Sequence, residues 1–200
     1  MARANLTAER IFAQAERLVD ESGYDALTMA ALAKGFGVAV PSLYKHVPSL
    51  GTIRAHMAIQ AVRELDAALA HAARDLSKGE ALRAMAHAYR AYAIHHPGRY
   101  TATLRAPDPH DVAYQDASNQ VLQTVFAMLK TYGVAGVAAI DATRALRAAL
   151  HGFIALQNEH GFGLTQDVNQ SFDRLIEALN IAFCHWAQES ATEGRPTHAK

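Results

Sequence analysis

Four side chains that can donate hydrogen bonds lie close together between residues 42 and 46. They are the hydroxyls of Ser42 and Tyr44, the ammonium group of Lys45 and the imidazole of His46. Groups of these types can donate to phosphate oxygens and to the edges of bases together. The alternative is that they form the solvated polar face of an ordinary helical hairpin.

The elements that carry these donors are predicted to be two short helices joined by a tight turn, over residues 27–47. Thr28 can cap the first helix through its hydroxyl, and Gly37 marks its end, where a left-handed residue is favoured. Pro41 suits the first turn of the second helix, because its missing N–H would have no partner there. Leu43 and the residue one turn later then point to the core. Such a pair can place one helix end in the DNA major groove.

Short motifs in this region match a known family. They are Gly23-Tyr24, Leu27-Thr28, Leu32-Ala33, Gly37-Val38, Pro41-Ser42-Leu43-Tyr44 and His46-Val47. Over residues 7–57 the chain resembles the N-terminal domain of TetR-type transcriptional regulators. The resemblance implies three helices, of which the third reads the major groove, and a fourth that leads to an effector domain.

The resemblance also implies the DNA-contacting residues. Thr28 would contact a phosphate at the start of the second helix. The groove-facing set on the third helix would be Val40, Pro41, Ser42, Tyr44, Lys45 and His46. Near the start of the fourth helix, where the family usually has a phosphate-contacting lysine, this chain has Leu50 followed by glycine. Phosphate contacts are therefore expected from Lys34, Lys45 and Arg3.

Composition narrows the class of protein. The chain has 200 residues, half of them hydrophobic, which is enough for a substantial core. Its 19 basic and 19 acidic residues leave no net charge, which excludes a general, strongly basic nucleic-acid coat. Cys184 is the single cysteine, so an intrachain disulfide is excluded and a reducing compartment fits. The sequence contains no signal peptide and no apolar run near the ~20 residues of a membrane span, so we expect a cytoplasmic protein without a membrane partner.

Helical periodicity runs along the whole chain and strand signals are nearly absent, so an all-α fold of about nine helices is predicted. Outside the pair described above, helices are expected at residues 7–22, 49–75, 77–96, 97–105, 112–132, 137–159 and 169–188. Residues 1–48 are predicted to form a three-helix DNA-binding domain with a helix-turn-helix. Residues 49–190 would form a larger helical domain for effector binding and dimerisation, and residues 191–200 a disordered tail.

The last two predicted helices carry more apolar residues than a single buried stripe requires. These residues are Leu146, Leu150, Phe153, Leu175, Leu179, Phe183 and Trp186. They could all close the core of one protomer, or some could form an external patch, which usually marks an interface. TetR-type regulators dimerise through their last two helices, so the resemblance implies a homodimer. Two recognition helices about 34–36 Å apart would then read a palindromic site.

Residues 144–163 resemble an effector domain type named for a Trp-His-Gly motif, with Leu150 in place of the tryptophan before His151 and Gly152. The resemblance implies a pocket for a small molecule of unknown identity among the fourth to eighth helices. Aromatic or polar side chains on inward faces are candidate contacts, although each could instead be a hydrogen-bonded core residue. The candidates are Tyr89, Tyr92, Tyr100, Phe126, Arg147 and His151.

Signals for catalysis and for metal or cofactor binding are missing from the sequence. Gly35 and Gly37 lack the third glycine of a dinucleotide fingerprint and follow a helix, where that motif needs a strand. The adjacent His95 and His96 point about 100° apart on a helix and cannot bind one ion together. No glutamate has a histidine three residues later, as a di-iron bundle would need. We therefore expect no catalytic residue, metal or cofactor.

The resulting hypothesis is a dimeric, sequence-specific DNA-binding transcriptional regulator, a repressor that a small-molecule ligand releases from its operator. The alternative is an all-helical small-molecule binding or carrier protein without DNA binding, whose N-terminal hairpin only packs. Tyr44 and Lys45 discriminate between the two hypotheses, because a carrier has no need of them.

Overall fold

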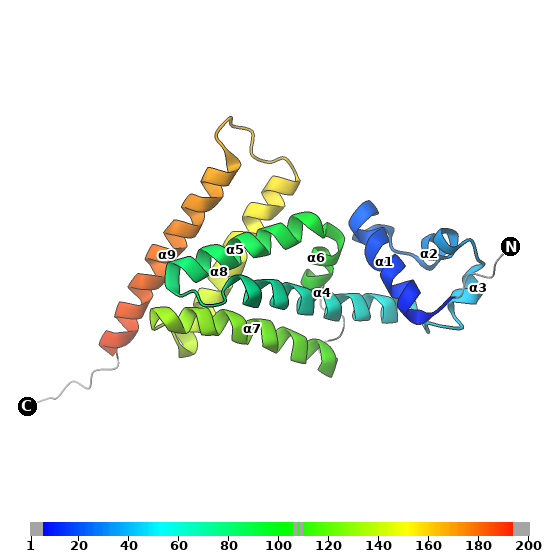
Figure 1. Cartoon of the computed structure of the whole chain (residues 1–200), viewed down its shortest axis with the longest axis horizontal. Coiled ribbons are helices and arrows are strands. Elements are labelled where there is room, and N and C mark those ends of the chain that lie inside the picture. Colours follow the sequence, from blue (N-terminus) through cyan, green and yellow to red (C-terminus); the bar gives the residue numbers. More distant parts are fainter. Residues whose placement is uncertain (1–5, 106–107, 109, 194–200) are drawn as a thin grey trace, which may run out of the picture. The chain divides into compact units, whose positions relative to one another are not determined.

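The structure, a computed structural model, describes residues 6–105, 108 and 110–193, with side chains to residue 186. In this part of the chain it contains nine α-helices, one short 3-10 helix and no strand, which confirms the all-α fold (Figure 1). The elements are α1 (Ala8–Ser22), η1 (Tyr24–Ala26), α2 (Met29–Phe36), α3 (Val40–Leu43), α4 (Leu50–Ala72), α5 (Lys78–His95), α6 (Pro97–Leu104), α7 (Val112–Tyr132), α8 (Gly136–Asn158) and α9 (Val168–Glu193).

Two of the predicted element boundaries need correction. The second helix of the N-terminal pair begins at Val40, one residue before the proline, and its α-helical part ends at Leu43. At the other end of the chain, α9 continues to Glu193, so the prediction of disorder from residue 191 is wrong for residues 191–193. Residues 194–200 lie outside the described part of the chain.

The chain divides into two compact units. The first unit comprises residues 1–65 and 92–119, and the second comprises residues 66–91 and 120–200. The helices α4, α5 and α7 contribute residues to both units. The domain boundary expected at residue 48 falls inside the first unit, which contains α6 and the first part of α4 as well as α1–α3.

The core of the first unit is built from apolar faces at helical spacing. In α1, the buried residues Ile11, Ala15 and Val19 recur every fourth position, and the helix begins at the N-cap Thr7. It ends at Gly23, whose φ of 86° favours a residue without a side chain. The side chains packed against this face come from α2, α3, α4 and α6 and from the segments directly before α2 and after α3: Leu27, Leu32, Leu43, Val47, Ile53, Met57 and Ala102.

Within the first unit, α6 lies directly on the backbone of α1. A Cβ atom added at Gly98 would lie 2.2 Å from both the carbonyl carbon and the carbonyl oxygen of Val19. Real Cβ atoms essentially never make contacts under 3.0 Å. The two helices can therefore meet at this distance only because residue 98 has no side chain.

A charged network next to Gly98 joins α6 to α1 and α4. The backbone N–H and Nε of Arg99 donate to the carboxylate of Asp20 at 3.0 and 2.7 Å, and Nη1 donates to Glu64 at 2.8 Å. The hydroxyl of Tyr92 also donates to Glu64, at 3.0 Å. Burial and the neighbouring Glu64 carboxylate raise the pKa of Tyr92, so this hydroxyl stays a donor. Arg99 therefore fixes α6 on α1 through Asp20 and on α4 through Glu64.

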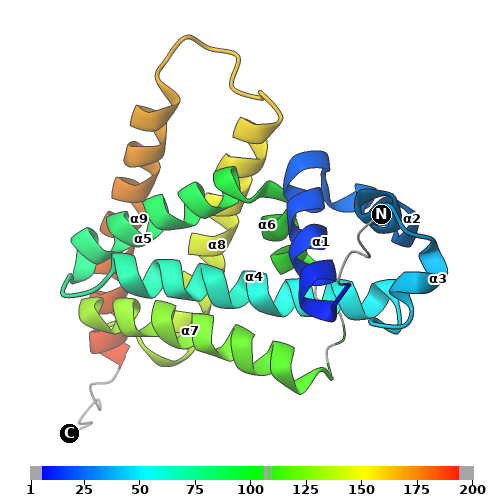
Figure 2. The same ribbon diagram turned by 45° about the vertical axis from the view of Figure 1, so that its right-hand side comes forward.

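The second unit is built around the antiparallel pair α8 and α9, which the segment 159–167 joins (Figure 2). Phe172 of α9 is fully buried and lies 5.0 Å from the ring of Phe153 of α8, centroid to centroid. Arg90 of α5, only 8% exposed, donates to the side-chain oxygens of Gln157 and Asn169 and lies over the ring of Phe172. This arginine ties α5 to both helices of the pair.

No single helix in the described ranges is long and apolar enough to cross a membrane. Only α7 and α8 together meet the length and composition criteria, as a pair bent by 111°.

Candidate nucleic-acid interface and ligand cavity

The turn between α2 and α3 is held by backbone interactions that the local sequence dictates. The Thr28 hydroxyl caps α2 by accepting from the Ala31 N–H at 3.0 Å, as predicted. Gly37 ends the helix in the left-handed conformation, with a φ of 64°. The next residue, Val38, donates its N–H back to the Ala33 carbonyl at 3.0 Å, which completes a typical C-terminal cap. The two helices are therefore joined by a turn with a defined geometry.

Two buried anchors orient α3 and the turn that follows it. Leu43 and Val47 are 0% and 1% exposed, and the Val47 N–H donates to the Leu43 carbonyl at 3.0 Å. The three residues between these anchors form a hydrogen-bonded turn beyond the end of α3, and all three are exposed. Tyr44 is 52% exposed, and Lys45 is exposed as well.

The predicted DNA-contacting residues are brought together at the surface of the first unit. Lys34, Pro41, Lys45 and His46 are exposed, whereas Val40 and Ser42 are half-buried. Within the part of the chain that the structure describes, no hydrogen bond or ion pair engages the side chains of Ser42, Tyr44, Lys45 or His46. The hydroxyl of Thr28 accepts a bond as the cap, and its hydrogen stays available to a phosphate. The predicted contact at Arg3 lies outside the described residues.

Charge in the first unit is separated along the chain, a signal that our sequence analysis missed. The first 48 residues contain five basic and five acidic side chains, so their net charge is zero. All five acidic residues precede Leu27, however, and no Asp or Glu occurs between Asp25 and Glu64. The basic residues in that acid-free segment are Lys34, Lys45, Arg54 and Arg63. The helix-turn-helix is therefore the part of the first unit whose charge suits a polyanion.

Arg54 is a further residue that the sequence did not single out. Its Nη2 donates to the carbonyl of Leu27 at a long 3.5 Å, directly before the N-cap of α2. Its guanidinium carbon lies 5.6 Å from the centre of the Tyr24 ring. This arginine therefore helps to place the start of α2 against α4.

The second unit contains a cavity among α4, α5, α7 and α8. Its lining residues are Leu69, Met85, Ala86, Tyr89, Val121, Val125, Thr143, Leu146, Arg147 and Leu150. Its volume is about 50 Å³. Small-molecule sites usually measure about 300–1,000 Å³, so a ligand of more than a few atoms enters only when the lining side chains move apart.

Two of the six predicted ligand contacts, Tyr89 and Arg147, line this cavity. Tyr92 and Tyr100 belong to the first unit, where Tyr92 bonds to Glu64 and Tyr100 is buried. Phe126 and His151 lie in the second unit, half-buried and not among the residues that line the cavity. Inward-facing aromatic residues were thus a poor guide to the cavity wall, because most of them pack within the core.

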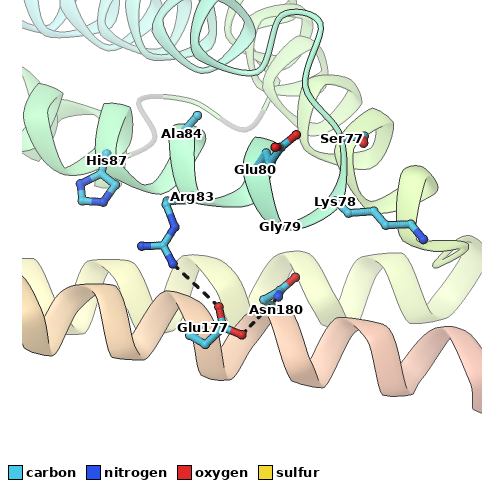
Figure 3. Close-up of a pocket in the computed structure, with 9 residues that line it drawn as sticks. All are labelled: Ser77, Lys78, Gly79, Glu80, Arg83, Ala84, His87, Glu177 and Asn180. Carbon is cyan, nitrogen blue, oxygen red and sulfur yellow. Dashed lines mark hydrogen bonds and ion pairs between the residues drawn. The ribbon is translucent and has the colours of Figure 1, made fainter.

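A larger and more polar groove, of about 740 Å³, lies between the start of α5 and α9 (Figure 3). Arg83 pairs there with Asp173 at 3.1 Å and with Glu177 at 3.8 Å, and His87 Nε2 lies 2.9 Å from the same aspartate. These side chains are about half exposed. Their charges are mixed and already engaged with one another, so the groove offers less to a ligand than the apolar cavity.

The residues predicted for the dimer interface divide into two groups. Leu146, Leu150 and Phe183 are between 0% and 6% exposed within one chain, so they belong to the protomer core and we withdraw them from the interface. Leu146 and Leu150 of α8 line the cavity, and the ring of Phe183 packs edge-on against the ring of Tyr132. The half-buried members remain candidates: Phe153, Leu175, Leu179 and Trp186.

Ile181 of α9 and Leu156 of α8, which were not among the predicted interface residues, are 63% and 52% exposed and extend this apolar surface. Among the described residues, no group of three or more His, Cys, Asp or Glu side chains could hold a metal ion.

Two family models match this chain. Residues 11–49 match bacterial regulatory proteins of the tetR family, and residues 82–179 match the tetracyclin repressor-like C-terminal domain. These matches cover the helix-turn-helix described above and most of the helices that surround the cavity.

Similar proteins include two HTH-type transcriptional regulators. Rv0681 of Mycobacterium tuberculosis is 38% identical over 155 residues, which cover 77% of this chain and 71% of the relative. YobS of Bacillus subtilis is 35% identical over 178 residues, which cover 88% of this chain and 92% of the relative. A TetR variant of Acinetobacter baumannii, solved in complex with minocycline, shares the fold with a TM-score of 0.66 at 19% identity, over 90% of this chain and 97% of that one. The chain therefore belongs to the tetR family of bacterial transcriptional regulators.

Proposed function

We propose that this protein is a dimeric repressor that a small molecule, bound in the cavity of the second unit, releases from a palindromic operator. The observation that carries the DNA-binding part is the row of exposed donors in the turn that follows α3, held between the buried Leu43 and Val47. Tyr44 and Lys45 use no other protein group within the described residues, so their donors are available to a duplex. A carrier protein would have no reason to present them.

In the proposed complex, base edges and phosphates are contacted by different residues. Ser42, Tyr44 and His46 donate to base edges in the major groove, and Lys34 and Lys45 neutralise phosphates on either side. Thr28 donates its hydroxyl to a phosphate at the start of α2. The acid-free segment around these residues avoids repulsion from the DNA backbone.

The proposed dimer forms through α8 and α9. Exposed or half-buried apolar side chains on these helices, including Ile181 and Leu156, would be covered by the same pair of helices from the partner. The small residues Ala145, Ala149 and Gly152 of α8 would allow close approach between the helices. Two-fold symmetry then presents two copies of α3 to successive major grooves.

Ligand and operator are proposed to compete through a coupling free energy. Because α4 contributes to the cavity wall and to the first unit, a ligand that parts the lining side chains would act on the helix shared by both units. Coupling is reciprocal, so operator DNA weakens ligand binding by the same factor, typically about 1–3 kcal/mol. The bound minocycline of the Acinetobacter TetR variant is a precedent within the fold.

Binding of the full-length protein to a labelled duplex from its own upstream region tests the DNA-binding part. Lys45→Ala should weaken binding by about tenfold or more, since contacts to a charged group are worth about 1.5–3 kcal/mol. Tyr44→Ala should weaken binding by about fivefold, since a hydrogen bond between neutral groups is worth about 1 kcal/mol. Losing Lys45 in both protomers should also make the slope of log K against log salt less steep by about 1.8.

Lys130→Ala, which removes an exposed lysine from α7 in the second unit, is the matched control and should leave affinity and slope unchanged. No detectable duplex binding by the unaltered protein at low salt would refute the proposal in favour of the carrier. An effect of Lys130→Ala as large as that of Lys45→Ala would refute the assigned surface.

A further inference from the structure

The cavity among α4, α5, α7 and α8 has a single charged lining residue, and that residue is a cation. Seven of its ten lining side chains are aliphatic or methionine, and the other three are Tyr89, Thr143 and Arg147. No acidic residue lines it. An apolar interior with one positive group selects against cationic ligands and favours an apolar molecule with one negative group.

The polar side chains of the cavity wall differ in whether they already form a hydrogen bond within the protein. The Thr143 hydroxyl donates to the Ala139 carbonyl one turn earlier, at 2.7 Å. In contrast, the Arg147 guanidinium has no hydrogen bond or ion pair with any of the residues that the structure describes. In the neighbouring Arg144 on the same helix, Nη1 lies 3.6 Å from Oδ1 of Asp141, so that arginine is paired. Arg147 is therefore the group of the wall that is free to bind a ligand.

The position of Arg147 suits a head group at the mouth of the cavity. Its side chain is exposed, whereas Leu146 and Leu150 beside it on α8 are buried in the wall. A guanidinium presents parallel N–H groups that match the two oxygens of a carboxylate. An anion held there keeps its charge near solvent while the rest of the molecule reaches the apolar interior.

The interior suits a narrow aliphatic body. The cavity of about 50 Å³ must widen to accept one, and Met85, with its unbranched and flexible side chain, is the lining residue most able to move. Each methylene that becomes buried should tighten binding about fourfold until the widened cavity is full. Affinity should therefore rise with chain length over a short series.

We propose that the effector is a small aliphatic carboxylic acid whose carboxylate pairs with Arg147 and whose hydrocarbon chain enters the cavity. This inference rests on the proposed function in one respect, namely that this cavity is the effector site. The ligand class itself follows from the lining of the wall.

Calorimetric titration of the full-length protein with hexanoate, octanoate, octan-1-ol and octylamine tests the inference. Octanoate should bind at least about tenfold more tightly than octan-1-ol, because only octanoate pairs with Arg147. It should also bind more tightly than hexanoate, because it buries a longer chain, and octylamine should bind most weakly. Arg147→Gln should abolish the preference for octanoate over octan-1-ol. The control Arg144→Gln, which removes the neighbouring arginine outside the cavity, should keep that preference.

Val121→Phe, which fills the cavity from α7, should weaken the binding of octanoate and of octan-1-ol to the same extent. An unchanged circular dichroism spectrum would show that this variant is folded. The inference is overturned if no probe binds, if octan-1-ol or octylamine binds as tightly as octanoate, or if Arg144→Gln has the same effect as Arg147→Gln. Duplex binding measured in parallel separates this inference from the proposed function. Octanoate that binds as expected without weakening operator binding would refute the ligand-released repressor and leave the ligand class standing.

Discussion

Replacing Gly98 by alanine should destabilise the protein by about 2 kcal/mol, although alanine is the better helix former. The added Cβ would lie 2.2 Å from the carbonyl carbon and oxygen of Val19, where contacts under 3.0 Å essentially never occur. The helices α6 and α1 must then separate by about 0.8 Å or more, the difference between these two distances. The Cβ atom of Val19 would also lie only 2.6 Å away, and no side-chain rotation can move any of these three atoms.

Overpacking of this kind costs about 1–3 kcal/mol, and the rigid neighbours place Gly98→Ala near 3 kcal/mol. The helix propensity of alanine returns at most about 1 kcal/mol, which leaves the net loss of about 2 kcal/mol. The separation also strains the adjacent bonds from Arg99 to Asp20, the shorter of which is 2.7 Å. For a chain of this size the expected decrease in melting temperature is about 4–8 °C.

Urea unfolding followed by circular dichroism, at one fixed protein concentration, measures the effect of Gly98→Ala. Gly35→Ala is the matched control, because it adds the same methyl group to a helix of the same unit. Its Cβ would meet only the end of the flexible Gln14 side chain, at 3.2 Å, so it should stabilise the protein by up to about 1 kcal/mol. If Gly98→Ala proved as stable as the unaltered chain, the close approach of α6 to α1 would be wrong.

Two further predictions concern pH and assembly. Burial, with a smaller effect of Arg63, lowers the pKa of His56, which stacks on Phe12 at 3.8 Å. The contribution of His56 to stability is therefore present above the ordinary histidine pKa of about 6.5 and is lost as the pH falls through the lowered pKa of this side chain. His56→Gln should flatten that part of a profile of unfolding free energy measured between about pH 5 and 8. An unchanged profile would contradict this. Ile181→Glu should shift the dimer towards monomers in analytical ultracentrifugation and weaken operator binding, whereas Leu122→Glu, at an exposed apolar site of α7, should do neither. A dimer that survives Ile181→Glu would place the interface elsewhere.

The helix-turn-helix could be predicted from the sequence because its determinants are local. The cap at Thr28, the left-handed turn at Gly37 and the anchors Leu43 and Val47 all act within a few residues along the chain. The exposure of Tyr44 and Lys45 follows from those anchors, since a helical turn that buries one side must expose the other. The same reasoning placed most helix boundaries to within a few residues.

Contacts between helices could not be predicted in this way. Periodicity identifies an apolar face but not the element that covers it, so Leu146, Leu150 and Phe183 fitted an interface as well as a core. The tertiary structure assigned them to the core. Likewise, Tyr89 and Arg147 line the cavity only because α4, α5, α7 and α8 converge there.

The sequence by itself determined the helical class, the family resemblance and the surface proposed to read DNA, because those depend on residues within one or two turns of each other. Only the tertiary structure decided that Arg99 pairs with Asp20, 79 positions away, and that Gly98 is the contact point between α6 and α1. A glycine after a proline suggests a break in a helix, and nothing in its neighbours along the chain indicates the helix that lies against it. Partners so far apart in sequence are selected by the packing of the whole unit.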